Sequence, residues 1–154
     1  MTQEISEPGR ESGVLPDPRD AASRRPKATP YELIGGDAAL RDMVERFYAL
    51  MDTEPALAGI RRLHPANLDG SVDKLYCFLS GWLGGPQRYT EKYGPPMLRA
   101  RHLPFSIGRQ ERDQWMAGMS LAMEQAGIEA GLRATLEAAF FRTADWMRNR
   151  EEPE

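Results

Sequence analysis

The chain has 154 residues, of which 41% are hydrophobic and 28% are charged, and its formal net charge is −3. This length and composition predict one globular domain with a core of its own. The acidic balance argues against nucleic acid or an anionic membrane surface as the main partner, because both are bound by clustered basic side chains. Cys77 is the only cysteine, so neither an intramolecular disulfide nor a cysteine-rich zinc site can form.

Residues 1–28 differ in composition from the rest of the chain. They contain five acidic residues, five basic residues, four prolines and no aromatic residue. Such a segment buries too little apolar surface to offset the entropy lost on ordering, so we predict a disordered tail over 1–28 and one folded domain over 29–150. The tail has no apolar core typical of a secretory signal, and no apolar run in the sequence is long enough to span a bilayer. We therefore predict a cytoplasmic protein, which also suits the single cysteine.

Helical periodicity dominates the first half of the predicted domain. Asp37 can cap a first long helix, and Pro55 opens a short turn that ends in the loop at His64-Pro65. Asp69 can cap a second long helix, which Gly84-Gly85-Pro86 stops. The apolar positions of the two helices recur three and four residues apart, and they are Leu40, Met43, Val44, Phe47, Tyr48 and Met51 in the first and Leu68, Val72, Leu75, Leu79 and Trp82 in the second.

The second half of the domain begins with a break in this periodicity. Residues 86–108 are predicted to be irregular, because Gly94-Pro95-Pro96 and Pro104 interrupt them. A loop of this length in a compact domain usually has a function of its own or wraps a non-protein partner. Two further helices are predicted over about 110–125 and 129–148, and Gly127 separates them. No segment alternates with the period of two that a strand requires, so the fold class is all-α.

Histidine chemistry in this chain depends on His64 and His102, the only two histidines. Taken alone, a histidine placed like His102, before Leu-Pro-Phe, is more often a capping or packed residue than a ligand. However, a short helical turn would aim Arg99 and Arg101 at an anionic cofactor edge, and Phe105 would follow as part of an apolar wall. A haem needs one neutral imidazole for its iron, an apolar slot and cations near its propionates, and this segment offers all three. The sequence offers no zinc-ligand cluster, no histidine at nucleophile spacing and no phosphate-binding loop after a strand.

A family resemblance extends from Tyr31 to about Met147. In their order and spacing, six fragments resemble a group II truncated haemoglobin: Gly35-Gly36, Arg46-Phe47-Tyr48, Phe78-Leu79, Trp82-Leu83-Gly84-Gly85-Pro86 with Tyr89, Arg99-Ala100-Arg101-His102-Leu103-Pro104-Phe105, and Glu111-Arg112-Asp113-Gln114-Trp115. The resemblance implies a two-over-two helical sandwich, a compressed globin fold that holds one haem b (iron protoporphyrin IX).

The resemblance also implies roles for individual residues. His102 matches the proximal iron ligand, Trp115 the tryptophan over the haem, and Tyr48 the distal tyrosine. His64 matches a variable distal position in a loop. The remaining matches are Ser71 and Leu75 on the distal side, and Tyr89, Arg99 and Arg101 as candidate contacts to the propionates.

Simpler interpretations exist for several of these residues. Core packing alone would explain Tyr48 and Trp115, although buried Tyr and Trp need partners for their O–H and N–H groups. A loop histidine before proline, such as His64, is often merely exposed. Arg99 and Arg101 have the alternative of being solvated surface residues.

The leading functional hypothesis is reversible binding of O2 or another diatomic ligand, such as NO or CO, at a histidine-ligated haem. Tyr48, Trp115 and His64 would donate hydrogen bonds to the partly negative outer oxygen of bound O2. The same donors suit NO detoxification or peroxide reduction with an external electron donor, so the sequence leaves both ligand storage and enzymatic turnover open. The alternatives are a haem-based gas or redox sensor acting through a partner protein, and a haem-free globin-like interaction module. The chain would act as a monomer or a homodimer.

Overall fold

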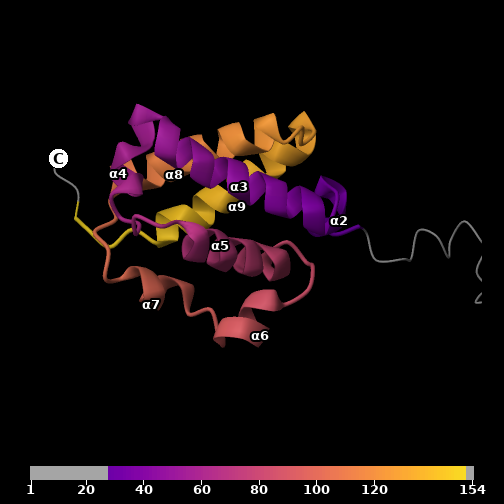
Figure 1. The fold of residues 1–154 in the computed structure, drawn as a ribbon, viewed down its shortest axis with the longest axis horizontal. Helices are drawn as coiled ribbons and strands as arrows, with labels where there is room; N and C mark the ends of the chain where they lie inside the picture. Colours follow the sequence, from indigo (N-terminus) through magenta and orange to yellow (C-terminus); the bar gives the residue numbers. More distant parts are fainter. Residues whose placement is uncertain (1–27, 152–154) are drawn as a thin grey trace, which may run out of the picture.

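The computed structural model describes residues 28–151, and within that range the regular elements are all helical (Figure 1). The predicted all-α class is therefore confirmed. Except for Ala28, the tail predicted over 1–28 lies outside the described residues. The helices in chain order are α2 (Pro30–Ile34), α3 (Asp37–Thr53), the 3-10 turn η2 (Pro55–Leu57), α4 (Ala58–Arg61), α5 (Asp69–Trp82), α6 (Arg88–Tyr93), α7 (Leu98–His102), α8 (Arg109–Gln125) and α9 (Ala130–Trp146).

Four long helices form the body of the domain in the two-over-two arrangement that the resemblance implied. α3 packs on α8 and on α5, and α8 packs on α9. Figure 1 shows α3 and α8 in the upper part of the view, α9 and α5 below them, and α6 and α7 along the lower edge. The core lies between the layers and consists of buried side chains at helical spacing, including Leu40, Met43, Val44, Phe47 and Met51 of α3, Leu79 of α5, Met119 and Met123 of α8, and Leu136 and Phe140 of α9.

The expected helix caps were wrong in detail. α3 begins at Asp37 itself with Gly36 as its N-cap, and the Asp37 carboxylate instead accepts hydrogen bonds from Tyr76 and Arg88. α5 likewise begins at Asp69, and its backbone N–H donates to the side chain of Asn67. Both carboxylates still lie in a first helical turn, where the helix dipole favours negative charge.

The prediction of irregular chain over 86–108 was also wrong in part, because this stretch contains the short helices α6 and α7. Helices of six and five residues are too short to be stable alone, so contacts and hydrogen bonds with the rest of the domain must hold them. Among residues 28–151, the structure contains no helix that is both long and apolar enough to cross a membrane.

The start of the domain is docked firmly onto the end of α5. Thr29 and Glu32 form a reciprocal capping box at the first turn of α2. The backbone N–H of Tyr31 donates to the carbonyl of Leu83 at 2.9 Å. A Cβ atom on Gly85 would lie 2.6 Å from the Tyr31 ring, so glycine at this position allows the close approach of the two segments.

Candidate functional site

A cavity of about 620 Å³ opens between α5, α7, α8 and α9, with Tyr48 of α3 contributing to its wall. This volume lies in the usual range for a small-molecule or cofactor site. Most of its wall is apolar or aromatic, with side chains that include Leu63, Phe78, Leu79, Trp82, Leu98, Ile107, Phe140 and Met147. The wall therefore resembles a slot for a large flat apolar group rather than a polar active-site cleft.

The cavity brings together nine of the ten residues predicted to form the site. They are Tyr48, His64, Ser71, Leu75, Tyr89, Arg101, His102, Phe105 and Trp115. Arg99 does not line the cavity. Its Nη1 atom is buried and finds no hydrogen-bond partner among residues 28–151, which is a costly state for a cationic donor.

The ring of His102 has a defined orientation at the cavity wall. Its Nδ1 atom lies 2.7 Å from the carbonyl oxygen of Leu98. A carbonyl oxygen can only accept, so Nδ1 carries the hydrogen and the neutral ring keeps its free lone pair on Nε2. A ligating histidine typically donates its second ring N–H to such an acceptor, which fixes the tautomer and raises the basicity of the ligating nitrogen.

Arg101 has a different set of contacts from the one expected. Its guanidinium donates to the carbonyl oxygens of Pro96 at 2.7 Å, Pro95 at 3.1 Å and Tyr93 at 3.4 Å. Its charge also lies over the ring of Tyr89, 5.6 Å from the ring centroid. Arg101 therefore ties the chain before α7 to α7 itself, and its donors are largely used within the protein.

An aromatic cluster forms the part of the wall that carries the predicted distal residues. The ring of Trp115 meets Phe47 at 5.2 Å and Phe140 at 5.4 Å between centroids, both edge-on. Tyr48 is buried, and its ring meets Phe47 on one side and His64 on the other. Burial raises the pKa of the Tyr48 hydroxyl far above its usual range, so this group stays protonated and available as a donor.

The predicted role of His64 as a hydrogen-bond donor does not fit its geometry. Its Nδ1 atom lies 2.8 Å from the carbonyl oxygen of Ile60, so Nδ1 holds the hydrogen in the neutral ring. Burial lowers the pKa of His64, the charge of Arg61 lowers it further, and the hydrogen bond to Ile60 opposes both. The neutral ring thus presents a lone pair at Nε2, and it can donate from that atom only when it is protonated.

Several polar residues of the wall were not predicted from the sequence as site residues, and they include Lys74, Glu111, Arg112 and Thr143. Helical spacing could have found Lys74, because Ser71, Leu75, Phe78 and Trp82 lie on the same face of α5. Arg112 could not be assigned from spacing alone. Its guanidinium donates to Asp113 of its own helix at 2.9 Å and to Asp145 of α9 at 2.7 Å, so its place depends on how α8 packs against α9.

The set of donors and wall residues fits a haem. In the neutral ring, His102 offers the lone pair of Nε2 for the iron, and the wall offers a largely apolar slot for the porphyrin. Lys74 is a cation in the cavity wall. Arg99 follows the lining residue Leu98 in the chain, and its buried Nη1 has an unmet need for an acceptor such as a carboxylate.

Comparison with known proteins agrees with this description. A family model described as bacterial-like globin matches residues 29–149. The group 2 truncated hemoglobin YjbI of Bacillus subtilis (strain 168) is 40% identical over 125 residues, which is 81% of this chain and 92% of that protein.

Solved structures are similar over most of the chain. The group II 2-on-2 hemoglobin from Agrobacterium tumefaciens aligns with a TM-score of 0.79 at 47% identity, covering 83% of this chain and 99% of that chain. The cold-adapted truncated hemoglobin from the Antarctic bacterium Pseudoalteromonas haloplanktis TAC125 aligns with a TM-score of 0.78 at 40% identity, covering 80% of this chain and 100% of that chain. The truncated oxygen-avid haemoglobin from Bacillus subtilis aligns with a TM-score of 0.72 at 39% identity, covering 79% of this chain and 100% of that chain.

Proposed function

Because this chain belongs to the bacterial-like globin family and is a group II truncated haemoglobin, we propose that it binds haem b in the cavity through His102. The observation that carries the proposal is the hydrogen bond from Nδ1 of His102 to the Leu98 carbonyl, which leaves Nε2 as the free nitrogen. Arg99 and Lys74 are the residues that we expect to contact the propionates. Arg101 is less suited, since its donors are already engaged with backbone carbonyls.

A bound haem would supply an iron that can take up a diatomic gas such as O2, CO or NO. We propose that Tyr48 and Trp115 donate hydrogen bonds into the space that the gas would occupy. Both lie in a wall made largely of apolar groups, where a hydrogen bond to a partly charged acceptor is strong because water does not compete. Two such donors favour slow release of O2, and slow release is the activity that we propose first.

His64 supports a second candidate activity, peroxide reduction. A neutral imidazole with a free lone pair can accept a proton from a hydroperoxide O–H, which a donor-only pocket cannot do. Reduction of one peroxide to two waters consumes two protons and two electrons, so it requires an external electron donor. Reaction with NO would likewise require a reductant to restore the protein. We propose the cytoplasm as the location, where such reductants are available.

The absorption spectrum of the purified protein, before and after addition of haem, tests the proposal. We expect a Soret band from bound haem at one equivalent per chain. His102→Ala should lose the haem or bind it far more weakly, and added imidazole should partly restore the spectrum. His64→Ala, which removes the other histidine of the wall, should keep the haem.

The outcomes also separate the alternatives. A chain that never gives a Soret band would support the haem-free interaction module. A haem protein whose ligand binding changes its affinity for a partner protein would support the sensor. If His64→Ala lost the haem and His102→Ala kept it, the two histidines would have exchanged roles and the proposal would be wrong.

A further inference from the structure

The helix that carries His102 has little packing to hold it in place. α7 is five residues long, and none of those residues, all of which the structure describes, is buried. Its N-cap, Met97, has a φ of 43°, a conformation that a non-glycine residue keeps only where its surroundings enforce it. The position of His102 therefore depends on the hydrogen bonds that hold the two ends of the helix.

The N-terminal end of α7 is held by hydrogen bonds from Arg101, a residue of the same helix. Arg101 donates to the carbonyl oxygens of Pro95 and Pro96, just before the helix. At the C-terminal end, the backbone N–H of Leu103 donates to the Ala100 carbonyl at 3.3 Å and that of Phe105 donates to the His102 carbonyl at 3.0 Å, and both donors belong to the chain that directly follows the helix. A side-chain donor to the same His102 carbonyl comes from 47 residues further along the chain, and it ties this end of α7 to another part of the domain.

Asn149, just beyond α9, makes one hydrogen bond to His102 and two to Ile107. Its Nδ2 atom donates to the carbonyl oxygen of His102 at 3.2 Å. Its Oδ1 atom accepts from the backbone N–H of Ile107 at 3.0 Å, and its own N–H donates to the Ile107 carbonyl at 2.9 Å. These bonds fix which end of the amide is oxygen and which is nitrogen, because each meets a partner of one kind only.

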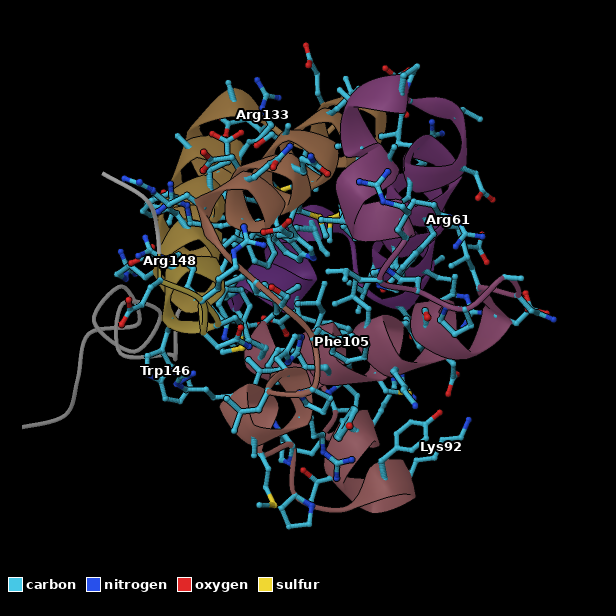
Figure 2. All side chains as sticks on the ribbon, turned by 90° about the vertical axis from the view of Figure 1, so that its left-hand side faces the viewer. Arg61, Lys92, Phe105, Arg133, Trp146 and Arg148 are labelled. Carbon is cyan, nitrogen blue, oxygen red and sulfur yellow. The ribbon has the colours of Figure 1, made fainter. Side chains whose placement is uncertain are left out.

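Neighbouring residues extend the same attachment. Arg150 donates to Ser106 at 3.2 Å and to Glu111 at 2.9 Å, and Glu111 accepts from the N–H of Gly108 at 2.8 Å. Figure 2 looks at this end of the molecule, with Phe105 labelled near the centre and Arg148 labelled at the yellow ribbon of α9. The end of the domain is thus bonded to the segment between His102 and α8.

We propose that Asn149 is a positioning residue for His102. It holds the His102 carbonyl, and with it the backbone that sets how far the imidazole reaches into the cavity. Arg101 holds the other end of α7, so the two residues together define the helix position that packing leaves free. The inference rests on the proposed function, in which His102 is the iron ligand.

Two substitutions distinguish the contribution of the Asn149 bond to His102 from that of its side-chain bond to Ile107. Asn149→Leu has a similar size and removes both side-chain bonds. Asn149→Asp keeps the acceptor for the Ile107 N–H but replaces the donor to His102 with a second acceptor. In ferrous protein without added gas, we expect the iron–histidine stretching band of the resonance Raman spectrum to shift or broaden in both variants. Transfer of haem to an excess of a haem-scavenging protein should be faster by about tenfold, the effect of losing roughly one hydrogen bond in a buried setting.

Asn67 provides the matched control. Its side chain also accepts from a backbone N–H, that of Asp69, but it lies at the start of α5 and away from α7. Asn67→Leu should leave the stretching band and the rate of haem transfer unchanged.

The result that would overturn the inference is an unmoved band and an unchanged rate of haem transfer in both Asn149 variants, even if their melting temperatures fall. That result would make Asn149 a purely structural residue. Failure of the proposed function looks different, because the unsubstituted protein would then show no iron–histidine band at all. If Asn149→Leu does not fold, the Asn149→Asp variant still decides the question, since it keeps the bond to Ile107.

Discussion

The ring of Tyr48 meets the ring of His64 edge-on, with the two centroids 5.6 Å apart. The Tyr48 hydroxyl can donate a hydrogen bond, whereas the free nitrogen of the neutral His64 ring can accept one. Tyr48 keeps its proton because burial raises the pKa of its hydroxyl, whereas the neutral His64 ring presents a lone pair at Nε2. The wall of the cavity therefore offers a donor and an acceptor side by side, and four predictions test what each residue of this wall and its supports contribute.

Tyr48→Phe removes only the hydroxyl and keeps the packing against Phe47. A hydrogen bond to a charged acceptor contributes roughly 1.5–3 kcal/mol, and each 1.4 kcal/mol corresponds to about tenfold in rate. We expect O2 to dissociate about tenfold faster or more in stopped-flow measurements. CO carries less charge, so its dissociation should change much less. Equal acceleration of both gases would mean that the substitution only widened the path to the site.

Trp115→Phe removes the indole N–H and part of the ring while keeping an aromatic contact to Phe47 and Phe140. We again expect about tenfold faster release of O2 and a smaller change for CO. Because Tyr48 and Trp115 would share one acceptor, the double variant need not show the product of the single effects. If both single variants and the double variant release O2 at the parent rate, these residues serve packing only.

The stability of the protein should depend on pH through His64. Burial lowers the pKa of His64 below its usual value near 6.5. As the pH falls below about 6.5, the unfolded chain takes up a proton that the folded chain resists, so the free energy of unfolding falls. His64→Gln cannot titrate, and both proteins keep His102. The melting temperature of the parent should therefore fall more steeply than that of the variant between pH 7 and pH 5, whereas parallel curves would show that His64 titrates normally.

Gly59→Ala should disturb the support of His64. A Cβ atom on Gly59 would lie 2.7 Å from Oε1 of Gln114, the atom that accepts from the N–H of Ile60 at 3.0 Å. The Gln114 amide would have to move, and an unsatisfied N–H costs about 1–3 kcal/mol, more than the gain of up to ~1 kcal/mol from alanine in a helix. We expect a net loss of about 1 kcal/mol in chemical denaturation.

Gly70→Ala is the control for this substitution. A Cβ atom on Gly70 meets nothing within 4 Å in the described part of the chain, and Gly70 lies in the first turn of α5. Gly70→Ala should therefore be neutral or stabilising by up to about 0.5–1 kcal/mol. Equal losses in the two variants would show that the contact between Gly59 and Gln114 has no special role.

A chain shortened to begin at Ala28 should keep its haem and its melting temperature. Thr29 already closes the capping box of α2, and Tyr31 is bonded to Leu83, so the domain has its own docked start. Absorption spectra and thermal unfolding of the two proteins provide the comparison. A fall of many degrees, or loss of haem, would show that residues 1–27 pack on the domain.

The local sequence was sufficient for the four long helices, whereas most of the residues that gather at the cavity were predicted from the family resemblance. Apolar positions three and four apart specify which face of a helix is buried, whatever it packs against. The predicted helices over about 110–125 and 129–148 correspond to α8 at Arg109–Gln125 and α9 at Ala130–Trp146. The composition of the segment around His102 likewise indicated a cation-flanked imidazole beside an apolar wall.

The short helices and the hydrogen bonds of single atoms were decided by the tertiary structure. α6 and α7 are too short to have a periodicity of their own, and the long-range bond from Asn149 to His102 has no local signal. The sequence also did not predict that Arg101 would donate hydrogen bonds to backbone carbonyls, or which nitrogen of His64 would be bonded to the Ile60 carbonyl. Burial patterns repeat along the chain and can be predicted from it, whereas a hydrogen bond depends on where a distant partner lies to within a fraction of an ångström, and only the packed domain fixes that position.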